Sequence, residues 1–412
     1  MKRAVICLAV AGFSLCGAGT PPAFAESAVE FKQLSPDAQV QALIDSGLRY
    51  LKSQQTEAGT WGDEKTPPAI TALALKAFVQ EPSLTADTDF VKKGYDALLK
   101  NQLDDGGIYR NLLASYNTSI CVSSLSAVED DRFKPQIDKA VAYLKKLQWT
   151  PDTRPEYVND QEKFKDQQVV KDDKDPFFGG WGYGGNRAVS GHGRPDMSNA
   201  GMVLQALHDA RVDASDPSMQ RAILFLSRCQ NASETNDQAW AGNDGGFVYG
   251  PAVDKKGESF AGEYTGPDGK RMLRSYGSMT YVGLKSFIYA GLTKDDPRVK
   301  AAFDWITKNW SLDENPGLKL NNADAAKNGL YYYYQTLAKA LHAYGQPTIT
   351  DAEGETVDWR LALVAKLKEL QKEDGSWAGE KRWMEDNPVL VTSYVVLALQ
   401  EVREDLKARP AK

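Results

Sequence analysis

Residues 191–196 read Gly-His-Gly-Arg-Pro-Asp and place an imidazole, a guanidinium and a carboxylate at alternate positions. Such a loop could carry out acid–base chemistry, with His192 and Asp196 as the catalytic groups. It could instead bind an anionic group through Arg194. The simpler interpretation is an exposed polar loop in which Asp196 caps the helix that follows. Spacing alone specifies little, so the chemical interpretation stays a hypothesis.

Glycines and large aromatic residues gather in loops that recur along the chain. Residues 178–185 read Phe-Gly-Gly-Trp-Gly-Tyr-Gly-Gly and contribute Trp181 and Tyr183, while a later loop contributes Trp240 and Tyr249. The rings of these four residues could bind a ligand. They could also wedge between helices and stabilise the fold, which is what large aromatic side chains mostly do.

Polar residues near the later loop and a run of tyrosines add further candidates. Residues 331–334 are four consecutive tyrosines at the start of a predicted helix. Successive helical positions point about 100° apart, so only one or two of them can face a shared cavity. Their rings could stabilise a carbocation or stack on a sugar, and the alternative is core packing. The ligand-binding candidates added in this way are Asp244, Arg274, Tyr276, Tyr331 and Tyr332.

Metal and cofactor chemistry has little support in the sequence. The three histidines, His192, His208 and His342, lack the spacing of metal ligands. Cys121 and Cys229 stand far apart, and we expect two separate buried thiols rather than a disulfide. The chain shows no nucleophile elbow and no phosphate-binding loop. We therefore predict no metal and no cofactor.

The N-terminus has the pattern of a secretory signal. Lys2 and Arg3 precede an apolar run over residues 4–15, and Ala-Phe-Ala at residues 23–25 offers a cleavage site. We therefore expect a signal peptide over residues 1–25 and export to the periplasm or the extracellular space. A lipoprotein signal is the lesser alternative, because a bulky leucine precedes the cysteine that it would need.

The charge of the exported chain excludes several kinds of partner. Removing residues 1–25 takes away two of the 49 basic side chains and no acid, which moves the net charge from -6 to -8. No run of Lys or Arg predicts binding to nucleic acid or to an anionic membrane. Beyond the signal, no apolar run reaches the ~18 residues of a membrane span.

Amphipathic segments pair into helical hairpins along the remaining chain. In each hairpin an aromatic and glycine loop separates the first helix from a second, more apolar helix. A helix that is apolar most of the way round is buried on both sides, so the second helices should form an inner ring. The six hairpins are predicted over residues 40–80, 90–128, 137–210, 219–290, 299–344 and 360–402.

Six hairpins could close into a double-walled barrel or remain an open solenoid, and we expect closure. In a closed ring all inner helices run the same way, so their N-termini and the loops gather at one rim. Helix N-termini carry positive potential and free backbone donors, and loops on a rigid scaffold commonly carry function. We therefore expect the pocket at this rim and along the ring axis.

The helix ends near Leu51 and Leu367 carry glutamine and are followed by Gly-x-Trp, ending at Trp61 and Trp377. This pattern resembles the Gln-Trp motif of squalene-hopene cyclases, in which packing is the expected role of the tryptophan. The chain is similar to the terpenoid cyclase and protein prenyltransferase superfamily, which implies an all-α, single-domain α6/α6 toroid. The predicted segments are the signal peptide 1–25, a lead-in 26–39, the toroid 40–403 and a tail 404–412.

The chain departs from the catalytic signatures of the families it resembles. Squalene cyclases protonate their substrate from an Asp-x-Asp-Asp segment, but here Asp196 is followed by Ser198 and Asn199. Protein prenyltransferases bind zinc through an Asp-x-Cys pair, but serines stand two residues before both cysteines. The Gly-Cys-Gly-Glu-Gln segment of thioester domains is also missing. The resemblance therefore implies a fold more firmly than an activity.

Three classes of function remain open. The first is a terpene cyclase-like or degenerate enzyme that binds an isoprenoid or another apolar small molecule. The second is a non-catalytic binding or interaction scaffold with a protein partner. The third is a carbohydrate-active toroid in which Asp196 and Asp244 do the chemistry. An apolar axial cavity would favour the first class, a plugged axis the second, and a polar groove with two nearby acids the third.

Overall fold

The structure is a computed structural model that describes residues 28–153, 169–184, 194–251 and 258–411. These residues are mostly helical, as predicted. Within the described ranges, no helix is both long enough and apolar enough to cross a membrane. The predicted signal peptide and His192 lie outside the described residues.

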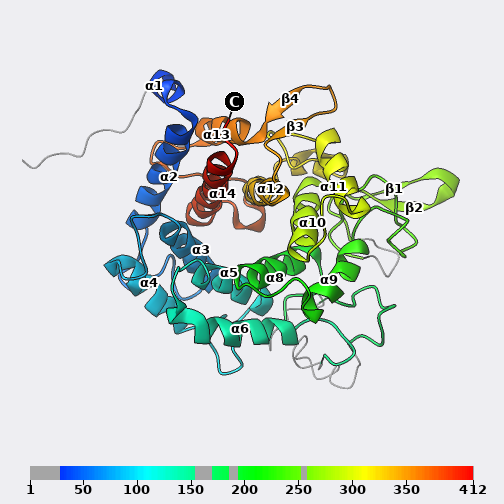
Figure 1. Ribbon diagram of the computed structural model, residues 1–412, viewed down its shortest axis with the longest axis horizontal. Coiled ribbons are helices and arrows are strands. Elements are labelled where there is room, and N and C mark those ends of the chain that lie inside the picture. The colour runs from blue at the N-terminus through cyan, green and yellow to red at the C-terminus, as the bar shows by residue number, and fades with distance from the viewer. Residues whose placement is uncertain (1–27, 154–168, 185–193, 252–257, 412) are drawn as a thin grey trace, which may run out of the picture.

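Six helices form a ring that closes on itself (Figure 1). Each packs against the next along the chain, and the last, α14, packs back against α3. Most are buried nearly all round, and this matches their apolar sequences. These inner helices are α3 (Pro68–Val79), α5 (Ala114–Leu125), α8 (Met197–Asp209), α10 (Gly277–Tyr289), α12 (Leu330–Tyr344) and α14 (Pro388–Ala408).

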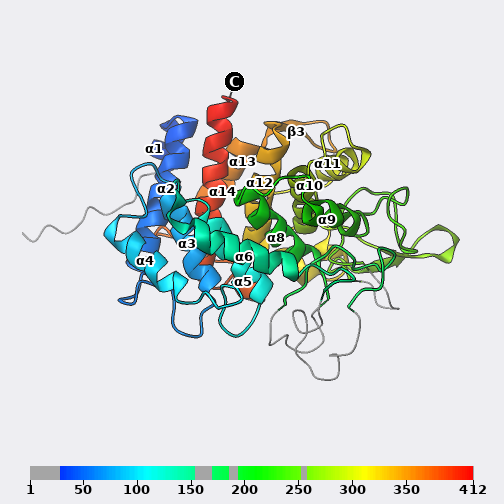
Figure 2. The same cartoon turned by 60° about the horizontal axis from the view of Figure 1, so that its bottom comes forward.

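A second set of helices lies outside the ring (Figures 1 and 2). These helices bury one face only: in α4, Val91, Tyr95 and Leu98 recur at helical spacing on the buried side. The outer helices are α2 (Pro36–Ser53), α4 (Asp89–Leu99), α6 (Lys134–Lys146), α9 (Pro217–Ser227), α11 (Pro297–Lys308) and α13 (Trp359–Leu370), preceded by the short α1 (Ala28–Gln33).

Tryptophans of the Gly-x-Trp loops pack inside the structure rather than facing a ligand. Trp61 donates its indole N–H to the carbonyl of Leu51 at 2.6 Å, and Trp377 donates to Leu367 at 2.7 Å. Both rings are almost completely buried. The sequence favoured packing for these two residues, and the structure confirms it.

Glycines in the same loops allow the backbone to approach the next outer helix. Gly179 has φ of 81°, and a Cβ there would lie 2.2 Å from the carbonyl oxygen of Arg221 in α9. Gly375 has φ of 85°, and a Cβ there would lie 2.5 Å from the hydroxyl oxygen and 3.0 Å from the carbonyl oxygen of Ser46 in α2. Only glycine combines this φ with so close an approach. Because Gly375 contacts the first outer helix, the last corner helps to close the ring.

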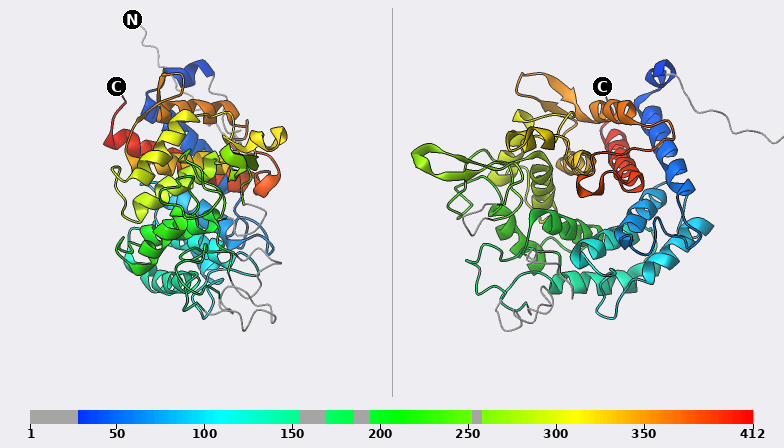
Figure 3. Two further views of the ribbon diagram at one scale, coloured as in Figure 1. Left: turned by 90° about the vertical axis from the view of Figure 1, so that its right-hand side faces the viewer. Right: turned by 180° about the vertical axis from the view of Figure 1, so that it is seen from behind.

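Two short β-hairpins depart from the all-helical prediction. Strand β1 (Glu263–Thr265) pairs antiparallel with β2 (Arg271–Leu273), and β3 (Thr348–Thr350) pairs with β4 (Thr356–Asp358). Both hairpins project from the outside of the ring (Figures 1 and 3). Strands of three residues are too short to show a clear alternation, which is why the sequence did not reveal them.

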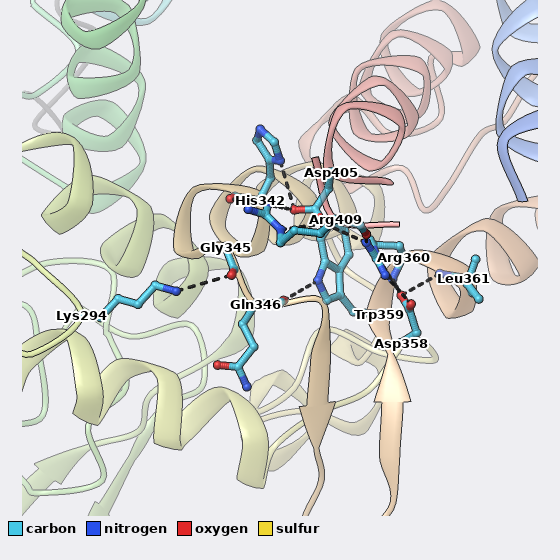
Figure 4. A network of polar contacts seen from close by, with 10 residues as sticks. All are labelled: Lys294, His342, Gly345, Gln346, Asp358, Trp359, Arg360, Leu361, Asp405 and Arg409. Carbon is cyan, nitrogen blue, oxygen red and sulfur yellow. Dashed lines mark hydrogen bonds and ion pairs between the residues drawn. The ribbon is translucent and has the colours of Figure 1, made fainter. Parts of the chain in front are cut away.

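The C-terminal part of α14 is fixed by ion pairs (Figure 4). Asp405 is completely buried and accepts hydrogen bonds from Arg360 of α13 and Arg409, and its carboxylate lies 3.2 Å from His342 of α12. The Asp405 hydrogen bond raises the pKa of His342. Helix α14 therefore continues to Ala408, into the stretch that the sequence assigned to a tail.

Candidate functional site

A cavity of about 280 Å³ lies at the end of the ring where the inner helices begin. The first turns of all six inner helices contribute to its wall, as expected for N-termini that gather at one rim. One contributing residue from each helix, in chain order, is Ile70, Asn117, Ser198, Met279, Tyr332 and Leu390.

Aromatic rings form most of the cavity wall. Phe260 lies 4.8 Å from Tyr249 and 5.3 Å from Trp383, measured between ring centroids, and Tyr332 meets Tyr394 edge-on at 6.1 Å. Their faces give the cavity a largely apolar surface with an electron-rich character. The eight aromatic residues that line it are Tyr116, Tyr183, Tyr249, Phe260, Tyr276, Tyr332, Trp383 and Tyr394.

Asp196 lies behind this wall and caps α8. Its carboxylate accepts hydrogen bonds from the backbone N–H of Asn199 at 2.9 Å and from the Asn199 side-chain amide at 2.8 Å. The Tyr249 hydroxyl lies close enough to favour the ionised form of the carboxyl. Burial raises the pKa of Asp196 to about 7 in spite of these hydrogen bonds. The cap suggested by the sequence is therefore present, on a carboxyl group that is part-protonated near neutral pH.

Hydroxyl groups are the main polar atoms of the cavity. The Tyr183 and Tyr249 hydroxyl oxygens lie 3.2 Å apart. On the neighbouring helices, the hydroxyls of Tyr116, Ser198 and Tyr332 line the same cavity. The cavity can therefore surround an apolar molecule and still offer neutral hydrogen-bonding groups on one side.

Glu385 was not among the candidates from sequence. It lines the cavity, it is 1% exposed, and its carboxylate accepts the backbone N–H of Tyr332 at 2.8 Å. Burial raises its pKa to about 7. Its carbonyl accepts the N–H of Gly379 at 2.6 Å. Glu385 thereby anchors the segment that precedes α14 to the first turn of α12, where Gly329 offers no side-chain cap.

The mouth of the cavity carries exposed apolar residues in an unusual backbone conformation. Leu113, Trp383 and Met384 have positive φ angles of 57°, 56° and 65°, which cost non-glycine residues conformational energy. Trp383 and Met384 are 44% and 46% exposed. The guanidinium of Arg382 lies 4.8 Å from the Trp383 ring. Such strain over a cavity is typical of ligand sites.

Four of the ligand-binding candidates line this cavity, namely Tyr183, Tyr249, Tyr276 and Tyr332. Two other candidates that are close to them in sequence, Trp181 and Tyr331, do not line it. Trp181 is completely buried and donates its indole N–H to Leu144 at 2.8 Å, so it packs like Trp61. Tyr331 is also outside the lining residues and packs edge-on against Tyr334.

The remaining candidates lie elsewhere. Asp244 and Arg274 line a separate cavity of about 450 Å³, where the Ser275 hydroxyl donates to Asp244 at 2.8 Å. Trp240 is buried, and the exposed Arg194 lies 5.5 Å from the Phe177 ring. His192, the second catalytic candidate, is outside the described residues. The structure therefore does not bring Asp196 and Asp244 together at one cavity.

Sequence reasoning missed half of the aromatic wall as well as Glu385. Tyr116 and Tyr394 lie in the first two turns of α5 and α14, so the expected convergence of inner-helix N-termini could have pointed to them. Phe260 and Trp383 come from loops outside the Gly-x-Trp pattern, and no local signal distinguishes them from packing residues.

Several solved structures share this fold. The terpene cyclase MstE from Scytonema, a type II enzyme, matches in its apo form with a TM-score of 0.53 and 15% identity, over 90% of this chain and 100% of that chain. A variant of it in complex with its substrate, geranylgeranyl dihydroxybenzoate, matches with a TM-score of 0.53 and 14% identity, over 90% of this chain and 99% of that chain. The GH76A alpha-1,6-mannanase from Salegentibacter sp. HEL1_6 matches with a TM-score of 0.49 and 11% identity, over 90% of this chain and 99% of that chain.

Identity of this size shows the fold alone. The toroid implied by the Gln-Trp resemblance is thus confirmed as a terpene cyclase-like fold. No protein-family model matches the sequence, and no curated protein matches it.

Proposed function

We propose that this protein binds an isoprenoid-class apolar ligand in the aromatic cavity, as a terpene cyclase-like enzyme or a degenerate relative of one. The observation that supports this most is the wall of eight aromatic side chains at the N-terminal ends of the inner helices. The fold shared with a terpene cyclase that binds a geranylgeranyl compound agrees with the proposal.

The size and surface of the cavity suit a small hydrocarbon-like molecule. At about 280 Å³ it lies near the lower end of the range of small-molecule sites, ~300–1,000 Å³. Burying apolar surface stabilises a complex by about 25 cal/mol per Å², so a ligand that fills this cavity gains most of its affinity from the walls. Tyrosine and tryptophan faces would also stabilise positive charge that develops on the ligand.

The other functions considered from sequence have less support. Glycoside chemistry needs two carboxylates about 5 to 10 Å apart on one site, whereas Asp196 and Asp244 belong to different places in the fold. An interaction scaffold needs no axial cavity. We further propose that the inner and outer helices pair into six hairpins, which together form a double-walled α6/α6 toroid. We also propose that the protein is exported to the periplasm or the extracellular space.

Ligand binding can be tested by filling the cavity. Leu390 lines it, whereas its neighbour Val389 does not. We expect Leu390→Trp to abolish binding of farnesol, measured by quenching of tryptophan fluorescence, and Val389→Trp to bind as the unmodified protein does. Melting temperatures show whether both variants fold. Mass spectrometry of molecules that co-purify with the protein gives an independent test. Absence of any co-purifying lipid together with no farnesol binding would contradict the proposal.

A further inference from the structure

The polar atoms that line the aromatic cavity indicate whether its ligand is charged. Among the described lining residues there is no lysine or arginine, and Glu385 is the one ionisable carboxyl. A phosphate or carboxylate inside this cavity would lose its hydration without gaining a cation. The other polar groups are hydroxyls and the Asn117 amide, which suit an uncharged ligand.

Tyr183 stands at the centre of the hydroxyl groups. Its hydroxyl oxygen is 3.2 Å from that of Tyr249. It is also near enough to Tyr116, Tyr276 and Tyr332 to contribute to the raised pKa of each of them. These residues come from two loops and the starts of three inner helices, so the fold as a whole brings their hydroxyls together.

A series of neighbouring polar groups leads from this centre to Asp196. The Tyr249 hydroxyl lies close enough to the Asp196 carboxyl to favour its ionised form, and its oxygen is 3.2 Å from that of Tyr183. When Asp196 is ionised it can only accept, so Tyr249 donates to it and Tyr183 donates to Tyr249. When Asp196 is protonated, its O–H can donate to Tyr249 and Tyr249 can donate to Tyr183. The Tyr183 hydroxyl can then donate into the cavity.

We propose that the cavity takes an uncharged isoprenoid-class ligand that carries one oxygen, and that the Tyr183 hydroxyl forms a hydrogen bond with that oxygen. Tyr249 and Asp196 act as positioning residues behind Tyr183. The inference rests on the proposed binding of an apolar ligand, and it adds the polar group of the ligand and the residue that recognises it.

The two orientations of these polar groups distinguish two kinds of oxygen. A hydroxyl group can donate or accept, so it fits Tyr183 with Asp196 in either state. A ketone oxygen can only accept, so it needs the orientation that requires protonated Asp196. Burial places the pKa of Asp196 at about 7. The charged or titratable groups that act on it or are affected by it are Glu258, Tyr249, Tyr276, Tyr183, Tyr332 and Cys229. Ketone binding should therefore weaken as pH rises through neutrality.

Three ligands of one carbon skeleton test the inference: farnesol, the hydrocarbon farnesene and farnesyl diphosphate. We expect the protein to bind farnesol about tenfold more tightly than farnesene, the effect of one well-placed hydrogen bond. Tyr183→Phe should remove that difference and leave farnesene binding within about twofold. Tyr331→Phe is the matched control, because it removes a tyrosine hydroxyl outside the cavity lining.

The outcomes separate the two proposals. If none of the three ligands binds, the proposed function fails, and this inference fails with it. If farnesol and farnesene bind equally, or if Tyr183→Phe affects both alike, the apolar cavity stands and the inference is wrong. Tightest binding of the diphosphate, reduced by Arg382→Ala at the mouth, would also overturn it.

A pH series adds a readout that a merely structural role would not change. We expect the affinity for an isoprenoid ketone of similar length to fall about tenfold between pH 6 and pH 8, while the affinity for farnesol stays constant. Asp196→Asn should remove this pH dependence, and asparagine remains a good helix cap. A pH dependence that persists in Asp196→Asn would exclude Asp196 as the group behind Tyr183.

Discussion

The two ends of the ring are built from the same six helices and have opposite character. Where the helices begin, the cavity of about 280 Å³ is aromatic. Where they end, a cavity of about 1190 Å³ is lined by charged side chains. There Lys76 pairs with Asp209 at 2.7 Å and Lys339 pairs with Glu401 at 2.6 Å. An apolar molecule would therefore gain more affinity at the aromatic end.

Three of the six inner helices carry a buried lysine near their C-terminal ends, namely Lys76, Lys285 and Lys339. A lysine near a helix C-terminus faces the negative end of the macrodipole, and its ion pair keeps the buried charge satisfied. Lys285 of α10 lies beside these pairs and donates to Gln205 at 3.0 Å, and burial lowers its pKa to about 7. At the aromatic end, tyrosines lie near the starts of four inner helices, and the two acids there, Asp196 and Glu385, have pKa values raised to about 7.

Breaking a pair at the charged end should have the largest effect on stability. Lys339→Ala leaves Glu401 without its partner, and we expect a loss of about 3–4 kcal/mol in the free energy of unfolding, measured by urea denaturation. The double variant Lys339→Met, Glu401→Met should recover most of it. Lys92→Ala breaks an exposed pair with Asp96 and should change nothing measurable. Farnesol binding should survive in all folded variants, and its loss would mean that the two ends are coupled.

Substitution of Gly179, in a loop beside the aromatic end, should cause the next largest loss of stability. Gly179→Ala would place a methyl group 2.2 Å from the Arg221 carbonyl oxygen, so we expect a loss of about 2–3 kcal/mol. Gly269 also has positive φ, but no atom lies within 4 Å of its would-be Cβ. Gly269→Ala should therefore cost only about 1 kcal/mol. Equal losses would show that close approach at the corner contributes nothing.

The two ends should also titrate in different pH ranges. Burial raises the pKa values of Asp196 and Glu385 to about 7, above their unfolded values, so the native state holds protons that the unfolded chain releases. Each carboxyl should therefore lower stability by about 2 kcal/mol as pH rises from 5 to 7. Asp196→Asn and Glu385→Gln should each remove part of this slope in thermal unfolding. His342 lies at the charged end, and because its pKa is raised from 6.5 it adds a loss of stability of the same sign only above about pH 6.5.

The acids at the charged end behave in the opposite way. Lysine partners lower the pKa values of Asp209 and Glu401, so the stability from these pairs is present at neutral pH and is lost only in acid. Lys285 has a lowered pKa and acts above pH 7, where stability should rise with pH. If Asp196→Asn leaves the slope between pH 5 and 7 unchanged, the assignment of that range to the aromatic end is wrong.

The smallest expected changes in stability come from relieving backbone strain at one residue of the aromatic end and at one residue of the charged end. Met384 has φ of 65° at the mouth of the aromatic cavity, and Arg211 has φ of 60° directly after α8 at the charged end. Glycine adopts this conformation freely, so Met384→Gly and Arg211→Gly should each stabilise the fold by about 0.5–1 kcal/mol. Only Met384→Gly should weaken farnesol binding. An equal effect of both variants on binding would contradict the assignment of ligand to one end.

Local sequence signals predicted the helices well where caps and periodicity agree. The hairpin predicted over residues 299–344 consists of α11, which begins two residues earlier at Pro297, and α12, which ends at Tyr344 as predicted. The hairpin predicted over residues 90–128 ends with α5 at Leu125, and α5 begins at Ala114, where Leu113 in the left-handed conformation starts it without a recognisable cap. Boundaries fail where a tertiary contact replaces the local signal.

The candidate site shows the same limit over shorter distances. Trp181 and Tyr183 are two residues apart in one loop, yet Trp181 packs against Leu144 and Tyr183 lines the cavity. Local pattern assigns both to the same class, since both are large aromatics beside glycines. Which of them reaches the cavity depends on the outer helix that each one meets, and that helix is distant in sequence.

The sequence by itself determined the helical class, the inner and outer helices, and the gathering of aromatic loops at one end, because these follow from periodicity and from the chain direction of paired helices. Only the tertiary structure decided which tyrosines share a cavity, that Glu385 and Phe260 join them, and that the acids Asp196 and Asp244 do not. Contacts between residues hundreds of positions apart depend on how the ring closes, and no local preference encodes that closure.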